Sequence, residues 1–281
     1  MAGTAAGGSR RNPLAPWLLV APGILWLLAF YVFPTLTLAR TSFATGDRVW
    51  YDGYKRAFTD YGDHLLRSFG YALSATLVAI VLGYPLAYVL AFRSGRLKNF
   101  LLGLVILPFF TTFLVRTFAW KTILNDDGVI VNSLGALSLL PADGRLLNTV
   151  WAVIGGITYN FLPFMILPIY VSLEKIDRRL TEAAQDLYCN QFQAFRKVVL
   201  PLSLPGVLAG SLLCFIPASG DFLNAELLGS PNQKMLGSVI QGQFLTVRDY
   251  PLAAALSFVL MAIIILLVIA YTRALGTEDL A

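Results

Sequence analysis

Residues Glu182–Gly206 read EAAQDLYCNQFQAFRKVVLPLSLPG, and this stretch decides how the rest of the chain is interpreted. It is a long polar and charged interruption in the second half of a chain that is otherwise mostly apolar. Its order is a short amphipathic helix, a basic segment with Arg196 and Lys197, and then prolines that reopen an apolar run. A polar segment between two apolar runs is predicted to be a loop that joins two membrane spans.

The composition supports a membrane protein with several spans. The 281 residues are 57% hydrophobic and only 13% charged, whereas a soluble domain carries about 25% charged residues. The apolar runs approach the roughly 20 residues that a helix needs to cross a bilayer. They are predicted as spans at 17–38, 69–92, 100–120, 149–173, 204–222 and 252–272. The fold class is therefore an all-α membrane protein with six transmembrane helices.

Six spans divide the chain into four parts and place both termini on one side of the membrane. Residues 1–16 are an N-terminal tail, and 17–68 hold the first span and a polar loop. Residues 69–272 form the core, which includes the polar loop 174–203, and 273–281 are a C-terminal tail. Basic residues are divided almost evenly between the two sides. Only the basic turn at 93–98 favours a cytoplasmic N-terminus on charge alone.

Several classes of function lack the residues they need. The sequence has no G-x-x-x-x-G-K-[ST] phosphate loop. His64 is its only histidine, and neither Cys189 nor Cys214 belongs to a metal-ligand spacing. The net charge of +5 is not gathered on one amphipathic face, so nucleic-acid binding is not predicted. If ATP drives this protein, the nucleotide site lies on another chain.

The residues Glu182-Ala183-Ala184, followed by Val198-Val199-Leu200-Pro201, resemble the EAA loop of ABC importer permeases. Further blocks are similar to permeases of the spermidine/putrescine type. These blocks are 113–120, 159–168, 215–222 and 241–251. Relatives that carry iron, sulfate, phosphonate-type or other small organic solutes share parts of them. The resemblance therefore favours a polyamine and leaves other solutes open.

The resemblance implies a type I ABC importer permease bundle in the inner membrane of a bacterium, with both termini cytoplasmic. In this family the EAA loop is a cytoplasmic coupling helix that docks into a separate ATPase. The implied partners are two ATP-binding subunits, a second homologous permease, an extracytoplasmic solute-binding protein and the lipid bilayer. ATP and magnesium would be bound by the ATPase, with no cofactor and no enzymatic reaction on this chain.

The residue types of the coupling loop suit docking. Small side chains let a helix lie close to a partner groove, and apolar side chains on a solvated loop are typical of helix-in-groove binding. The alternative is that the helix packs only on its own membrane domain. The candidate ATPase-coupling residues are Glu182, Ala183, Ala184, Leu187, Tyr188, Phe192, Leu200 and Pro201.

One position departs from the family pattern, which has glycine at the seventh residue of the motif, where this chain has Tyr188. Glycine adopts a left-handed turn without steric cost, and asparagine tolerates it better than tyrosine does. We expect the turn either to shift to Asn190 or to be absent. In the second case the helix runs on through Tyr188, whose ring then reaches the ATPase groove.

Prolines and glycines within the spans predict broken helices that line a pathway, with kinked packing in a rigid bundle as the alternative. The residues are Pro108, Gly155, Gly156, Pro163, Pro168, Pro217 and Gly220. Arg116 is about 16 residues into the third span, or about 24 Å at 1.5 Å per residue, which places it near the outer boundary. Charges at such depths are functional candidates.

Two hypotheses follow for the charges near the outer boundary. Arg116 pairs with Asp221 or with the Asp126–Asp127 pair and closes an outer gate, or Asp221 and Glu226 face a vestibule that attracts a cation. Phe110 and Tyr159 are candidates for cation–π contact with an ammonium group, although aromatic residues at span ends usually form the interfacial belt.

Two other classes compete with an ABC permease. A secondary transporter needs acids within its spans and preferably an internal repeat, and the sequence has no acid in the middle of a span and no convincing repeat. A membrane-embedded enzyme needs a catalytic cluster at one depth, and a single loop histidine argues against it. Transport that persists without an ATPase would favour the secondary transporter.

Overall fold

The computed structural model describes residues 15–44, 51–136 and 144–274, and every regular element in these ranges is helical. The α-helices are α1 (Ala15–Leu27), α2 (Phe33–Ser42), α3 (Asp52–Thr59), α4 (Gly62–Tyr88), α5 (Lys98–Ile106), α6 (Phe113–Leu124), α7 (Val129–Ala136), α8 (Val150–Glu174), α9 (Arg178–Asp186), α10 (Gln191–Ala194), α11 (Leu200–Ser219), α12 (Leu223–Leu228), α13 (Leu236–Gly242) and α14 (Tyr250–Ala274). Short 3₁₀ or π turns lie at Leu28–Val32, Val89–Arg93, Gly95–Leu97, Leu107–Phe110, Phe195–Val199, Pro231–Gln233 and Gln243–Val247. The predicted all-α class is confirmed.

Five helical segments in the described residues are long and apolar enough to cross a membrane. They are Leu19–Ser42, Gly62–Arg93, Val150–Glu174, Gln191–Ser219 and Tyr250–Ala274. A bent pair, Gly95–Phe110 and Phe113–Leu124, makes a sixth if it counts as one span. The segments that were predicted to begin at Phe69 and Leu204 begin earlier, because the flanking polar loops continue the helices.

The predicted third span is not one straight helix. Its two halves meet at an angle of 96°, and Thr111 and Thr112 between them have extended backbone with ψ angles of 143° and 147°. Pro108 lies in the 3₁₀ turn before this break, where a residue without an N–H group cannot continue an α-helical ladder. The Thr112 side chain then caps α6 by accepting a bond from the Val115 amide. The straight-helix depth expected for Arg116 is therefore wrong.

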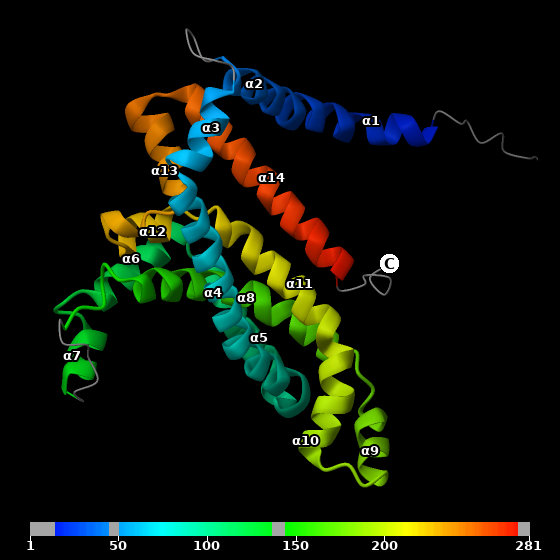
Figure 1. The fold of residues 1–281 in the computed structure, drawn as a ribbon. Helices are drawn as coiled ribbons and strands as arrows, with labels where there is room; N and C mark the ends of the chain where they lie inside the picture. The colour runs from blue at the N-terminus through cyan, green and yellow to red at the C-terminus, as the bar shows by residue number, and fades with distance from the viewer. Residues whose placement is uncertain (1–14, 45–50, 137–143, 275–281) are drawn as a thin grey trace, which may run out of the picture.

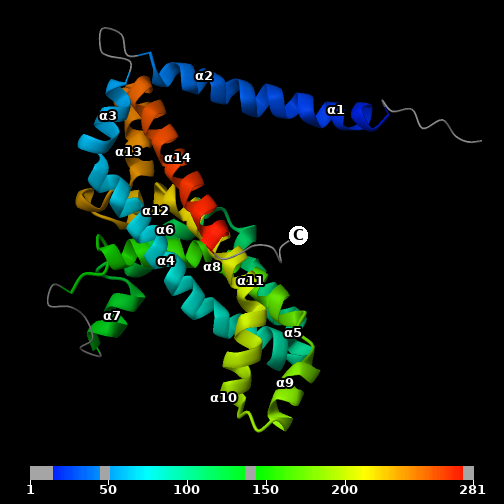
Figure 2. The same ribbon diagram turned by 45° about the vertical axis from the view of Figure 1, so that its right-hand side comes forward.

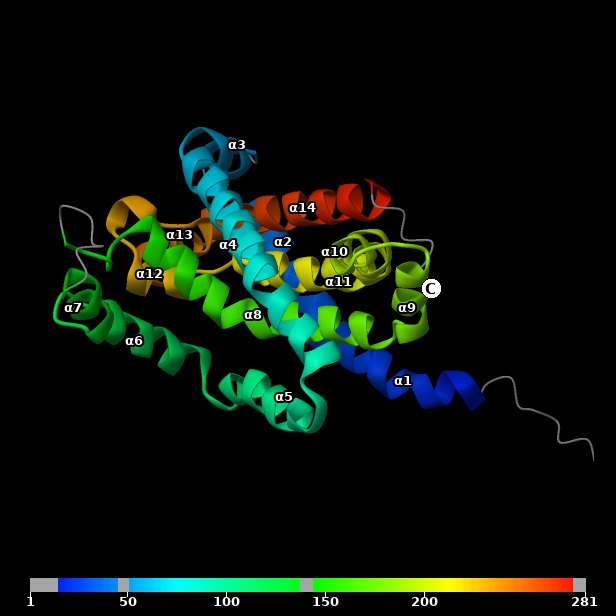
Figure 3. The same ribbon diagram turned by 90° about the horizontal axis from the view of Figure 1, so that it is seen from below.

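The predicted fourth span is continuous, although the sequence suggests breaks. Helix α8 runs through Gly155, Gly156, Pro163 and Pro168 without interruption. More than half of its most apolar window is buried by neighbouring helices. Figure 3 shows α4 crossing α8, with α11 beside it. Tertiary packing on both sides offsets the hydrogen bonds that the two prolines remove.

Helices α8 and α11 approach closely because α11 presents glycines to α8. A Cβ at Gly206 would lie 2.5 Å from the Ser172 Cβ and 2.6 Å from the Pro168 carbonyl oxygen. At Gly210 it would lie 2.9 Å from the Met165 Sδ. Small residues at such crossings let the backbones of membrane helices pack against each other. These contacts join the span after the coupling loop to the span before it.

The first span stands apart from the helical core. Figures 1 and 2 show α1 and α2 as one arm that projects from the end of the molecule where α3, α13 and the start of α14 meet. Helix α2 contacts α14, but none of the most apolar window of this span is buried. The polar loop after the first span contains the short helix α3. Helices α9 and α10 lie at the opposite end of the molecule.

Candidate functional site

The coupling loop begins with a capped helix that carries the EAA residues. The Asp177 carboxylate accepts a bond from the Arg179 amide at 3.0 Å and starts α9. Side-chain acceptors at this position satisfy amides that have no partner within the helix. Within α9, Glu182 and Ala183 are exposed, and Ala184 is buried. The helix therefore presents two of the three motif residues to solvent and uses the third for packing.

The expected backbone at Tyr188 is wrong in both of its alternatives. The turn occurs at Tyr188 itself, which has φ of 64°. The Cys189 amide donates to the Ala184 carbonyl at 3.1 Å, and the Tyr188 amide donates to the Gln185 carbonyl at 3.0 Å. This pair of bonds is the Schellman helix ending, whose left-handed residue is usually glycine. The two backbone bonds favour a conformation that costs tyrosine about 1–2 kcal/mol.

Asn190 does not take the left-handed position because its side chain caps the next helix. Its Oδ1 accepts a bond from the Gln193 amide at 2.8 Å, and the Gln193 side chain accepts one from the Asn190 amide at 3.1 Å. This reciprocal capping box fixes Asn190 with extended backbone. Helix α10 then continues through the Phe195–Val199 turn directly into α11.

Three apolar side chains stand in solvent where α9 turns into α10. Leu187 is 77% exposed, Tyr188 99% and Phe192 70%. We call these three residues the coupling tip. The other two predicted coupling residues, Leu200 and Pro201, form the start of α11 and are also exposed. The loop therefore exposes three apolar side chains at the turn between its two helices.

Aromatic rings hold the base of the loop against the membrane helices. Phe195 packs edge-on against Tyr84 and Tyr88 of α4, with ring centroids 5.8 Å apart in both pairs. The Tyr84 hydroxyl is also hydrogen-bonded to the Ser203 hydroxyl of α11 at 2.8 Å. Through these contacts the Phe195–Val199 turn, which follows the coupling tip, packs against α4, and α4 is hydrogen-bonded to α11.

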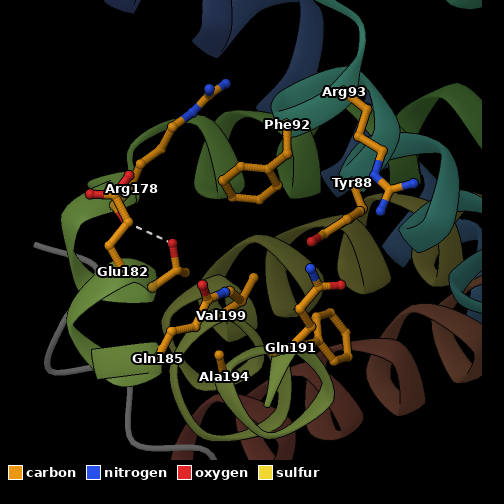
Figure 4. Close-up of a pocket in the computed structure, with 11 residues that line it drawn as sticks. Tyr88, Phe92, Arg93, Arg178, Glu182, Gln185, Gln191, Ala194 and Val199 are labelled. Atoms are coloured by element: carbon orange, nitrogen blue, oxygen red, sulfur yellow. Dashed lines mark hydrogen bonds between the residues drawn. The ribbon is translucent and has the colours of Figure 1, made fainter. Parts of the chain in front are cut away.

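A cavity of about 240 Å³ lies between this aromatic base and α9. Figure 4 shows Tyr88 and Phe92 on one side, Ala194 and Val199 opposite, and Glu182 and Gln185 of α9 along the edge. Within α9, the Thr181 hydroxyl donates to the Arg178 carbonyl at 2.6 Å. The cavity therefore lies between α9 and α4, and α9 packs on α10 and on the Phe195–Val199 turn.

A second contact holds the start of the coupling loop. Lys98, at the beginning of α5, forms an ion pair with Glu174, the last residue of α8. The Lys98 Nζ also lies 5.3 Å from the centre of the Tyr170 ring. The pair joins the basic turn after α4 to the end of α8, immediately before α9.

The candidate path residues lie in a different region, around α6, α8 and α12. The ion pair proposed for Arg116 does not form. Its Nη1 instead donates to the Asn160 carbonyl at 3.4 Å, and its guanidinium lies 5.7 Å from the Phe113 ring centre. Asp126, one of its other proposed partners, pairs with Arg145 at 3.4 Å.

Asp221 is buried, and both oxygens of its carboxylate accept hydrogen bonds from Asn224. Its two oxygens accept bonds from the Asn224 amide N–H at 2.8 Å and the Asn224 side-chain nitrogen at 2.7 Å. Burial raises the pKa of this carboxyl to about 6, and the bonds from Asn224 act in the opposite direction. With that pKa the group is still mostly ionised at pH 7.

The other candidates do not join Asp221 in one acidic surface. Glu226 is exposed and lines a separate cavity of about 210 Å³ together with Lys234. Phe110 is 84% exposed, and the Tyr159 ring packs against Trp120 with centroids 5.5 Å apart. The structure thus brings together Arg116 and Asp221 only indirectly, through residues that the sequence analysis missed.

The missed residues are Thr117, Asn160 and Asn224, all of them buried. The Asn160 Nδ2 donates to the Asn224 Oδ1 at 3.2 Å, and the Thr117 hydroxyl donates to the same oxygen at 3.3 Å. The signal that could have found Asn160 is an amide within the apolar run of its span. Among the described residues, no group of three or more His, Cys, Asp or Glu side chains is placed to hold a metal ion.

The family of this chain follows from its similarity to known proteins. Residues 79–275 match the family of binding-protein-dependent transport system inner membrane components. The chain belongs to this family. The matched residues begin within α4 and extend beyond α14, so they include the predicted coupling loop with α9, α10 and the start of α11.

Named relatives of the permease extend the match to almost the whole chain. It is 38% identical over 257 residues to the spermidine/putrescine transport system permease protein PotB of Haemophilus influenzae, covering 89% of this chain and 90% of that protein. It is 39% identical to PotB of Escherichia coli, covering 89% and 94%. The inner membrane ABC transporter permease protein YdcU of Escherichia coli is 32% identical, covering 99% and 95%.

Solved structures agree on the fold of the permease. A bacterial ABC transporter involved in the import of the acidic polysaccharide alginate matches with a TM-score of 0.70 and 19% identity, covering 92% of this chain and 94% of that chain. The MetNI methionine ABC transporter in an inward-facing conformation matches with a TM-score of 0.57 and 18% identity, covering 75% and 93%. The type I importer fold is therefore confirmed.

Proposed function

We propose that this chain is the membrane-spanning subunit of an ATP-driven importer for a polyamine such as spermidine or putrescine. The observation that carries the proposal is the identity of 38–39% to spermidine/putrescine permeases over 89% of the chain. The charges support a cationic solute only weakly, because Asp221 is engaged by Asn224 and Glu226 lies in a separate cavity near Lys234.

The energy source in this proposal is a separate ATPase that docks on the coupling tip. No phosphate-loop motif occurs in the sequence, so ATP and magnesium would be bound by the partner. Leu187, Tyr188 and Phe192 supply exposed apolar anchors on one side of the loop. Closure of two ATP-binding subunits would move the loop, and the Phe195 contacts would pass this movement to α4.

The permease would work beside a second, homologous permease subunit. In this arrangement the arm of α1 and α2 would lie against lipid or against the second permease, since its large apolar side chains are exposed along its length. They include Trp17, Trp26, Phe30 and Phe33, which are all more than 60% exposed. A solute-binding protein would deliver the solute from outside, and both termini would lie in the cytoplasm with the coupling loop.

Reconstitution tests the proposal. The chain is co-expressed with its neighbouring ATPase, permease and binding-protein genes, and the purified complex is placed in vesicles with ATP inside. ATP-dependent uptake of labelled spermidine or putrescine is expected, with loss of uptake when the ATPase carries an inactivating substitution. Uptake of another solute with no competition by polyamines would refute the solute assignment, and uptake without ATP would refute the mechanism.

A further inference from the structure

A directed chain of hydrogen bonds leads from Asp221 into α8. An ionised carboxylate only accepts hydrogen bonds, so the Asn224 side chain must turn its nitrogen towards Asp221, as observed at 2.7 Å. The Asn224 Oδ1 then faces the other way and needs donors. It receives the Asn160 Nδ2 at 3.2 Å. The charge on Asp221 therefore fixes the orientation of two successive amides.

The chain ends on an acceptor that has no partner. Because the Asn160 Nδ2 is used, its Oδ1 points away from Asn224, and this oxygen is buried without a hydrogen bond. The Nε of Arg116 is also buried without one. Within the described residues these are the two buried side-chain atoms that lack a partner, and Arg116 already touches Asn160 through its backbone carbonyl.

An unpaired donor and an unpaired acceptor in neighbouring side chains suggest a second arrangement. Burying either group unpaired disfavours a conformation, whereas pairing a guanidinium with an amide oxygen satisfies both. Helix α6, which carries Arg116, starts after the extended Thr111–Thr112 link and the 96° bend. The second arrangement would therefore need a shift of α6 against α8 but no movement of α5.

We infer that Asp221 acts through Asn224 and Asn160 to present the Asn160 Oδ1 as an acceptor for Arg116 in a second conformation of the α6–α8 contact. The three residues are positioning residues for the transport cycle, and none of them needs to touch the solute. The inference rests on the proposed function for its link to transport. It also gives a role to both charges, Asp221 and Arg116, although they do not form an ion pair.

A charge swap tests the relay in the reconstituted complex. Asp221→Asn removes the charge that orients Asn224, so we expect the kcat of uptake to fall about tenfold, the effect of one lost hydrogen bond to a charged group. The KM for the solute should not change. In the double variant Asp221→Asn with Asn224→Asp, an amide still donates to a carboxylate and an acceptor still faces Asn160. This swap should restore kcat.

A second cycle tests Arg116 itself. Arg116→Ala should lower kcat as Asp221→Asn does, and the combination should be no slower than the slower single variant. Thr158→Val is the matched control and should leave kcat unchanged, because the buried Thr158 hydroxyl of α8 donates to the Ile154 and Ala75 carbonyls and to no member of the relay. Independent, additive losses for Arg116 and Asp221, or a swap that fails to restore kcat in a complex of normal thermal stability, would overturn the relay.

A distance measurement tests the relay without transport. Spin labels at Phe118 of α6 and Trp151 of α8, which are both exposed, should give two distance populations in the purified complex. Asp221→Asn should leave one, and the charge swap should recover both. One population in the unsubstituted complex would overturn the inference. A complex that shows both populations but imports no polyamine would instead contradict the proposed function alone.

Discussion

Replacing Tyr188 by glycine distinguishes two roles of this residue in the predicted coupling loop. One is the conformation of its backbone, and the other is the binding of its ring to the ATPase. The left-handed turn at this residue strains every side chain with a Cβ, and the ring itself is 99% exposed. Tyr188→Gly therefore removes strain without removing buried contact. At the same time it deletes one of the three side chains of the coupling tip.

The two effects have opposite signs. Relief of the left-handed strain stabilises the fold by about 1–2 kcal/mol, and the extra freedom of glycine in the unfolded chain takes back about 0.5–1 kcal/mol. The net expectation is a gain of up to about 1.5 kcal/mol in the stability of the permease alone. A tyrosine anchor in an interface contributes more than about 1 kcal/mol, so the affinity for the ATPase should fall by roughly tenfold.

Two measurements distinguish these effects. Thermal unfolding of the purified permease in detergent reports stability, and titration of the ATPase against immobilised permease reports docking. Tyr188→Asn is the matched control, because asparagine tolerates the left-handed conformation but carries no ring. It should match the glycine variant in docking and lie between the two proteins in stability.

A docking role for the Tyr188 ring is refuted if Tyr188→Gly lowers the unfolding temperature while the affinity for the ATPase stays the same. That result would mean that the ring packs on its own membrane domain. It would then contribute to the fold and not to docking, which is the alternative that the sequence left open for this helix.

Three further predictions concern packing and partners. Gly206→Ala should lower the stability by about 1–3 kcal/mol through overpacking, because the new Cβ would lie 2.5 Å from a side-chain carbon of α8. Gly155→Ala is the control, since the space around Gly155 is open, and it should not lower stability measurably in a thermal unfolding assay. Lys98→Gln and Glu174→Gln should leave the unfolding temperature unchanged, because solvent-exposed ion pairs contribute little; a large drop would contradict that estimate. Trp26→Ala should not destabilise the isolated chain, because the side chain is 63% exposed, but should reduce co-purification of the second permease; equal recovery would argue against that contact.

The extent of the helical fold was predictable because bilayer thickness fixes the length of an apolar helix. The boundaries of the spans, and whether each span is straight, were less predictable. Pro108 ends a helix and produces the bend before α6, whereas Pro163 and Pro168 lie inside one continuous helix. The three residues have the same local chemistry. The difference lies in their surroundings, since α8 is packed between α4 and α11 while the bend region is largely exposed.

The polar cluster shows the same division. Arg116 and Asp221 were recognisable as unusual charges near apolar runs, and a direct pair was the simplest hypothesis. The structure inserts Asn160 and Asn224 between them. Hydrogen-bond partners that are separated by 64 residues along the chain cannot be read from spacing, because they depend on how three helices meet.

By itself the sequence determined that the chain is a polytopic helical membrane protein and that residues 182–206 carry a motif that resembles the EAA loop of importer permeases. Hydropathy and a local motif suffice for both, because each depends on residues that are close along the chain. Only the tertiary structure decided that the loop turns at Tyr188 and that Arg116 is linked to Asp221 through two amides. A helix ending depends on which backbone bonds close around it, and a buried network depends on which helices pack together.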